Sequence, residues 1–136
     1  MPALVVVGSY CDGDMYAEYL RSVGFDVLYG RTPEQALPYL GRRRPAVVIT
    51  DMVFQNSVYD GPTFIDAIRS RSDCAMTNVI VVSGFVRPTD RQRARLAGAD
   101  LFLLKPCPPD ALWGHVNHAV WAHERNARAD WNWPEE

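Results

Sequence analysis

The sequence predicts an α/β fold in which a parallel sheet is covered by helices on both faces. Short runs rich in valine, isoleucine and leucine alternate with longer stretches whose apolar residues recur every three to four positions. Runs of the first kind are typical of strands buried on both faces. The strand–helix order repeats five times with short connections, which favours parallel strands joined by helical crossovers.

The strands are expected where apolar residues run together without alternating polar ones. These runs are residues 3–7, 46–50, 79–83 and 101–104, with a weaker fifth strand at 26–29. In a parallel sheet all strands end at the same edge, so this pattern also indicates where reactive side chains should gather.

The helices are predicted from apolar spacing and from residues that start or stop a helix. Gly24 stops the first, and Thr32 followed by Pro33 starts the second, although Pro38 should weaken it one turn later. The remaining signals are Gly61-Pro62 at the start of the third helix, Thr89-Asp90 and Gly98 at the ends of the fourth, and Pro109-Asp110 at the start of the fifth.

Length and composition indicate a soluble chain with one domain. The 136 residues carry 14 basic and 16 acidic side chains, which gives a formal charge of −2. This charge argues against electrostatic binding of nucleic acid by the protein as a whole. No apolar run approaches the roughly 18 residues of a membrane helix. We expect a domain over residues 1–124 and a tail over 125–136, where Trp131 and Trp133 could fold back or associate.

The cysteines point to a reducing compartment. Cys11, Cys74 and Cys107 are odd in number and far apart, which argues against a disulfide framework or a CxxC metal site. Reduced thiols fit the cytoplasm best, and the N-terminus has no leader-like pattern.

Polar side chains follow three of the predicted strands. Asp51 follows the third, Ser83 and Gly84 end the fourth, and Lys105 follows the fifth. A carboxylate, a hydroxyl and an amine at neighbouring strand ends suit the transfer of a phosphoryl group to a carboxylate. Asp51 would be the nucleophile, Lys105 and Ser83 would bind phosphoryl oxygens, and Gly84 would leave room for the group.

Three motifs resemble those of the receiver domains of bacterial two-component response regulators, including the single-domain chemotaxis type. They are residues 49–52, 81–84 and 98–106, and the similarity covers roughly residues 3–122. The resemblance implies a doubly wound, flavodoxin-like sheet of five strands in the order 2-1-3-4-5, flanked by five helices.

The resemblance also implies roles for individual residues. Asp51 would be the phosphoacceptor, with Lys105 and Ser83 binding the phosphoryl group, and the backbone carbonyl of Val53 would bind a magnesium ion beside Asp51. Ser83 and Phe102 would be the switch pair that responds to phosphorylation. The donor would be a histidine kinase or a phosphotransfer protein.

The sequence departs from this family at the end of the first strand. The family usually has two adjacent acidic residues there, but residues 5–10 contain none, which weakens the expected magnesium site. Asp12 or Asp14, a few residues later, could turn back towards Asp51 and replace the missing acidic pair as magnesium ligands. They could equally begin the first helix, where acidic residues are favoured by the helix dipole.

Two functions are therefore expected. The first is a stand-alone response regulator, without a nucleic-acid-binding or enzymatic output domain, that signals to an unknown downstream protein through a phosphorylation-dependent surface. The alternative is a degenerate receiver that binds partners independently of phosphorylation. The fourth helix, fifth strand and fifth helix could also form a homodimer. No GxGxxG, GxSxG or P-loop pattern supports an unrelated enzyme.

Overall fold

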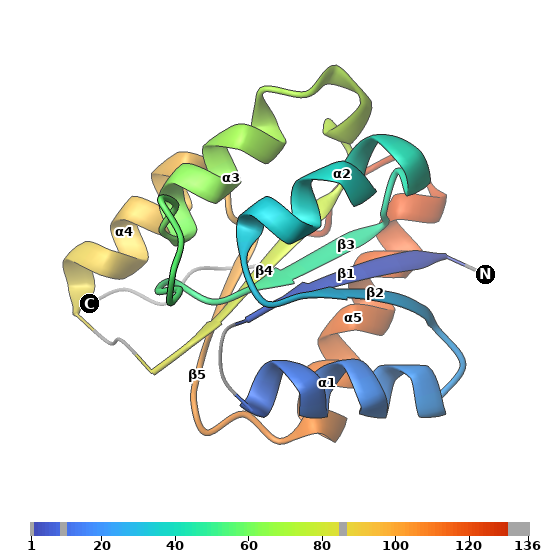
Figure 1. Ribbon diagram of the computed structural model, residues 1–136. Helices are drawn as coiled ribbons and strands as arrows, with labels where there is room; N and C mark the ends of the chain where they lie inside the picture. The colour runs from blue at the N-terminus through green and yellow to red at the C-terminus, as the bar shows by residue number, and fades with distance from the viewer. Residues whose placement is uncertain (1, 9–10, 85–86, 131–136) are drawn as a thin grey trace.

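The structure is a computed structural model that describes residues 2–8, 11–84 and 87–130. Its centre is a parallel sheet of five strands in the order β2-β1-β3-β4-β5 (Figure 1). The strands are β1 Ala3–Val7, β2 Asp26–Gly30, β3 Val47–Thr50, β4 Asn78–Ser83 and β5 Leu101–Leu104. The predicted fold class and strand order are confirmed.

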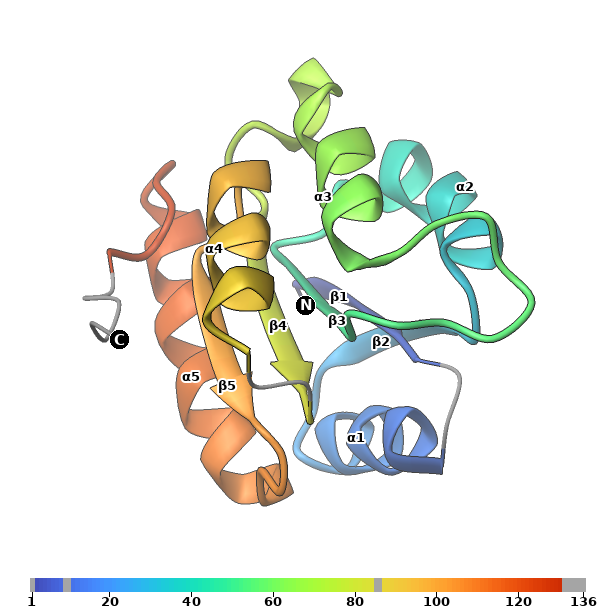
Figure 2. The same ribbon diagram turned by 90° about the vertical axis from the view of Figure 1, so that its left-hand side faces the viewer.

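Five α-helices cover the two faces of this sheet. They are α1 Cys11–Ser22, α2 Pro33–Arg43, α3 Gly61–Arg69, α4 Pro88–Ala97 and α5 Pro109–Glu124, with a short 3-10 helix at Ser72–Cys74. The helices α1 and α5 lie on one face, and α2, α3 and α4 lie on the other (Figures 1 and 2). Each face therefore has its own apolar core, because the strands are buried on both sides.

Local sequence signals explain most helix ends. Thr32 caps α2 by accepting a hydrogen bond from the Gln35 backbone N–H, and Gly98 ends α4 with a left-handed φ of 118°. The helix α4 begins at Pro88, slightly before the predicted Thr89-Asp90 start. The Asp90 side chain is paired with Arg87, at 3.0 Å from Nε, rather than capping the helix. Pro38 does not end α2.

The chain after α5 is attached to the amino-end edge of the sheet. The buried side chain of Asn78 accepts a 2.7 Å hydrogen bond from the Ala129 backbone and donates a 3.2 Å bond to the Ala119 carbonyl. Arg128 lies 3.6 Å from Asp100. These contacts lie at the opposite edge from the carboxyl ends of the strands, which they leave open. Trp131 and Trp133 fall outside the described residues.

In the part of the chain that the structure describes, no helix combines the length and apolar character that crossing a membrane requires.

Candidate functional site

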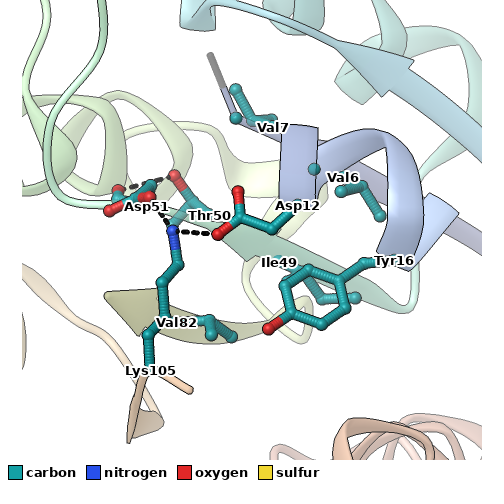
Figure 3. A pocket seen from close by; sticks show the side chains of 11 residues that line it. Val6, Val7, Asp12, Tyr16, Ile49, Thr50, Asp51, Val82 and Lys105 are labelled. Atoms are coloured by element: carbon teal, nitrogen blue, oxygen red, sulfur yellow. Dashed lines mark hydrogen bonds and ion pairs between the residues drawn. The ribbon is translucent and has the colours of Figure 1, made fainter. Parts of the chain in front are cut away.

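Three charged side chains meet at the carboxyl ends of the strands. The Lys105 ammonium lies 2.6 Å from an oxygen of Asp51 and 2.7 Å from an oxygen of Asp12 (Figure 3). Asp51 follows β3, Lys105 follows β5, and Asp12 lies in the first turn of α1. Lys105 is the only lysine in the sequence, so this chain has a single primary side-chain amine and places it here.

The strand register explains the meeting of Asp51 and Lys105. Thr50, the last residue of β3, pairs with Val7 of β1, and the Asp51 N–H donates to the Val7 carbonyl at 3.3 Å. On the other side, the Lys105 N–H donates to the Ser83 carbonyl at 3.0 Å. Both side chains therefore begin from backbone that is still bonded to the sheet, which limits where they can point.

The Asp51 carboxylate is buried and held through both oxygens. One oxygen accepts a 2.6 Å hydrogen bond from the Met52 N–H, and the other faces Lys105. The Gly61 N–H at the start of α3 donates to the Met52 carbonyl at 2.8 Å, so α3 packs directly on this turn. The carboxylate is therefore oriented before any ligand arrives.

The other predicted site residues lie on β4, on β5 and on the loops that follow β3 and β4. Ser83 is fully buried at the end of β4, whereas Gly84 is exposed, and a β-carbon added to it would meet none of the described residues within 4 Å. Phe102 is buried on β5, and the Arg91 guanidinium of α4 lies 5.7 Å from its ring centre. Val53 lies on the exposed loop after Asp51. The Ser83 carbonyl accepts the Lys105 backbone N–H, but none of these four residues is among the described residues that line the hollow beside Asp51.

Asp51 and Lys105 line a small hollow together with residues of β1, α1, β3 and β4, and its empty volume is about 230 Å³ with the open mouth included. Its lining is mostly apolar, with Asp12, Asp51 and Lys105 as its charged members among the described residues. Burial lowers the pKa of Lys105, but the hydrogen bonds and charges of the two carboxylates outweigh this and raise the pKa overall. The ammonium is therefore held firmly in its charged form.

The structure also tests whether these residues suit the expected magnesium ion. At the end of β1, Val7 has an apolar side chain, and the Gly8 carbonyl accepts a 2.8 Å hydrogen bond from the Tyr29 hydroxyl. Asp14 is exposed and does not line the hollow. Within residues 2–8, 11–84 and 87–130, no three His, Cys, Asp or Glu side chains converge as metal ligands. Both nearby carboxylates are committed to Lys105, so this donor set does not fit magnesium, which prefers free carboxylate and water oxygens.

Sequence reasoning missed Tyr16, which lines the hollow beside Asp12. Its hydroxyl donates a 2.8 Å hydrogen bond to the Cys107 carbonyl, just after Lys105 in the chain. In sequence, Tyr16 looks like one more apolar position of α1, and no local pattern reveals a partner 91 residues away. This bond ties α1 to the segment that carries Lys105.

Tyr16 should make stability depend on alkaline pH. Burial is the main reason that its pKa is raised from 10.0 to about 12. Above pH 10 the unfolded chain releases this proton while the folded chain keeps it, so the Tyr16 contribution is present below pH 10 and is lost towards pH 12. We expect the free energy of unfolding, measured with urea, to fall between about pH 8 and about pH 11.5. This fall should be smaller for Tyr16→Phe than for wild type, by about 2 kcal/mol.

The matched control for this prediction is Tyr19→Phe, on the same helix. Tyr19 is half-buried and makes an edge-to-face contact with Trp113, with ring centres 6.4 Å apart. Because Tyr16 is intact in this variant, the alkaline decline that Tyr16 causes should still be present. An identical alkaline decline in wild type and Tyr16→Phe would contradict the prediction.

Comparisons with known proteins converge on one family. The family model described as "Response regulator receiver domain" matches residues 13–117. Two curated relatives are each 26% identical: the transcriptional regulatory protein BaeR of Escherichia coli O6:H1 over 104 residues, and the regulatory protein LuxO of Vibrio cholerae over 106 residues. These matches cover 76% and 78% of this chain but only 41% and 22% of those proteins, so the chain spans less than half of either relative.

Solved structures share the fold. The chemotaxis protein CheY4 of Vibrio cholerae has a TM-score of 0.79 at 23% identity, covering 88% of this chain and 98% of that one. A receiver domain protein of Methanospirillum hungatei has a TM-score of 0.84 at 16% identity, covering 93% and 99%. NtrX of Brucella abortus has a TM-score of 0.82 at 25% identity, covering 93% and 28%.

Proposed function

Because the chain belongs to the receiver domains of response regulators, we propose that it accepts a phosphoryl group on Asp51 and signals through a surface that responds to this group. Receiver domains are signalling modules rather than classical enzymes, so the expected product is a modified protein. The observation that carries the proposal is the Lys105 ammonium at 2.6 Å from the buried Asp51 carboxylate. That pair provides a nucleophile and a cation for the incoming oxygens.

The reaction uses this chain's own groups as follows. An Asp51 oxygen attacks the phosphorus of a phosphohistidine, and the bond between phosphorus and the imidazole nitrogen breaks. The leaving imidazole keeps the electron pair and takes a proton from solvent, while Asp51 becomes an acyl phosphate. Lys105 then binds a phosphoryl oxygen in place of the carboxylate, and Ser83 donates a hydrogen bond to another. The donor is a histidine kinase or a phosphotransfer protein.

The signal passes from Ser83 to Phe102 along neighbouring strands. Ser83 lies on β4 two residues after Val81, and Val81 pairs with Phe102 on β5. Phe102 packs below Arg91 of α4, so movement of the Ser83 hydroxyl towards a phosphoryl group would change how α4 sits on β5. The surface of α4, β5 and α5 then binds a downstream protein or a second copy of the chain.

We propose that this receiver works in the cytoplasm, where phosphohistidine donors occur. Cys74 and Cys107 are both free thiols in the structure, in keeping with a reducing compartment. The alternative is a receiver that binds its partner without phosphorylation. One specific observation favours that alternative: Val7 and Gly8 provide no carboxylate at the end of β1. No step of the proposed reaction is therefore assigned to a metal.

Phosphoryl transfer from acetyl phosphate tests the proposal directly. Wild type, Asp51→Asn and Asp66→Asn are incubated with acetyl phosphate, once with magnesium and once with a chelator, and intact mass is measured. Asp66 is an exposed carboxylate on α3 and serves as the matched control. We expect one hydroxylamine-sensitive phosphoryl group on wild type and Asp66→Asn and none on Asp51→Asn. Unmodified wild type under both conditions would support the phosphorylation-independent module instead.

A further inference from the structure

Asp12 and Asp51 share one ammonium group. The Lys105 Nζ lies between their carboxylates, at 2.7 Å from Asp12 and 2.6 Å from Asp51, and Figure 3 shows Asp12 reaching it from α1. The side chains of Asp12, Lys105 and Asp51 are 32%, 22% and 10% exposed, so all three are shielded from solvent to a substantial degree. The Asp51–Lys105 pair, which phosphoryl transfer needs, is therefore joined by a second carboxylate, that of Asp12.

The position of Asp12 is set by close packing of α1 against the sheet. A β-carbon added to the buried Gly13 would lie 3.0 Å from the Tyr29 ring and 3.2 Å from the Gly8 carbonyl. A larger residue here would require the Tyr29 ring or the Gly8 carbonyl to give way by a few tenths of an ångström. The first turn of α1 thus rests on the end of β1, and Asp12 projects from it into the hollow.

The charge balance works against an incoming phosphoryl group. With both carboxylates charged, the described lining of the hollow carries two negative charges and one positive charge. A phosphoryl group adds further negative charge, and it must take the ammonium away from two carboxylates rather than one. Charges a few ångströms apart in a partly buried site interact by several times the thermal energy, so the second carboxylate matters.

We propose that Asp12 is a positioning residue that competes with the phosphoryl group for Lys105 and thereby lowers the affinity of the site for that group. This inference rests on the proposed function of Asp51. Asp12 retains Lys105 when the phosphoryl group is absent, and its charge opposes the group when it arrives. Neutralising Asp12 leaves Lys105 with one carboxylate and raises both anion affinity and the rate of phosphoryl uptake.

The test compares Asp12→Asn with Asp14→Asn. Asp14 lies two residues later on the same helical turn but is exposed and outside the hollow, so its substitution makes the same charge change elsewhere. Beryllofluoride, a phosphoryl mimic, is titrated with fluorine NMR detection of the bound anion, and initial rates are measured with acetyl phosphate. Both are run with magnesium and with a chelator. We expect Asp12→Asn to gain about five- to tenfold in affinity and rate under both conditions, and Asp14→Asn to match wild type.

A second readout follows the contact itself. Because Lys105 is the only lysine, ¹⁵N-lysine labelling gives one side-chain amine signal. Asp12→Asn should shift this signal and speed the exchange of its protons with water, whereas Asp14→Asn should leave it unchanged. Asp12→Glu should restore the wild-type signal and the wild-type affinity. Thermal unfolding checks that each variant is folded, and Asp12→Ser replaces Asp12→Asn if the latter unfolds.

The outcomes separate this inference from the proposed function. If wild type is phosphorylated on Asp51 while Asp12→Asn reacts no faster than Asp14→Asn, the competition is refuted and the function stands. A loss of uptake in Asp12→Asn only with magnesium would make Asp12 a metal ligand and also refute it. If no variant binds beryllofluoride or takes up phosphate, both proposals fail. Uptake by Asp12→Asn beside an unreactive wild type would support the competition for Lys105 but would refute phosphorylation of the wild-type chain.

Discussion

Replacement of Lys105 by methionine is expected to lower the affinity of the site for beryllofluoride by at least about 100-fold, which corresponds to about 2.7 kcal/mol. Lys105 is the one cation among the described residues that line the hollow, where it contacts both Asp51 and Asp12. Without it, an incoming anion meets two carboxylates and loses a charge-assisted hydrogen bond. Fluorine NMR titration and acetyl phosphate uptake measure the effect.

The control for this prediction keeps the charge and changes its shape. Lys105→Arg retains a cation, so it should bind beryllofluoride more tightly than Lys105→Met, although the flat guanidinium cannot take the place of a compact ammonium between two carboxylates. The double variant Asp12→Asn with Lys105→Met should recover part of the lost affinity. Equal binding by wild type and Lys105→Met would show that the pair does not receive the phosphoryl group.

The same substitution should change stability in a pH-dependent way. Loss of the ammonium leaves two partly buried carboxylates facing each other, and after allowance for their exposure we expect a cost of about 1–2 kcal/mol at neutral pH. The raised pKa of Lys105 means that its contribution is complete below about pH 10.5 and is lost as pH rises through the folded-state pKa. Urea unfolding should therefore show a smaller difference between wild type and Lys105→Met in strong alkali than at neutral pH.

The apolar pattern predicts the α/β fold class and the Asp51–Lys105 pair for one physical reason, whereas the family resemblance supplies the strand order. Strands buried on both faces need no alternating pattern, so they appear as plain apolar runs whose ends are easy to identify. The first polar residue after such a run must then lie at the carboxyl edge of the sheet. Asp51 and Lys105 are such residues, and the structure places them 2.6 Å apart.

Part of the motif at residues 98–106 has a structural explanation. Gly98 ends α4 with a left-handed φ, and its carbonyl accepts a 3.0 Å hydrogen bond from Arg69. Asp100 accepts from the Val79 N–H at 2.9 Å and pairs with Arg69 at 2.9 Å. These contacts anchor the start of β5 to β4 and α3. They thereby hold β5 in place at its start, and Lys105 follows the opposite end of this strand.

The place of Asp12 could not be derived from the sequence. Whether it approached the site depended on the distance between α1 and β1, which Gly13 and Tyr29 determine through packing. The loop after Asp51 presents the same difficulty. Glu34 of α2 accepts hydrogen bonds from the Ser57 hydroxyl at 2.6 Å and the Val58 N–H at 3.2 Å, and both partners are more than 20 residues away in sequence. Such contacts leave no local pattern.

Gly61→Ala is expected to destabilise the protein by about 2–3 kcal/mol and to impair phosphoryl uptake at the same time. A β-carbon at Gly61 would lie 2.8 Å from the Met52 α-carbon and 2.9 Å from the Asp51 carbonyl oxygen. Both atoms belong to the backbone, so relief requires movement of the chain rather than a change of rotamer. The moving segment contains the Met52 N–H that orients the Asp51 carboxylate. Urea unfolding and acetyl phosphate uptake should both respond.

The matched control is Gly114→Ala on α5, where a β-carbon would meet none of the described residues within 4 Å. Alanine is favoured over glycine within a helix, so this variant should be more stable than wild type by about 0.5–1 kcal/mol, with unchanged uptake. The two substitutions add the same methyl group and are expected to act in opposite directions. If Gly61→Ala were as stable and as reactive as wild type, the turn after Asp51 would have to be adaptable. In that case the close packing of α3 could not be what orients the phosphoacceptor.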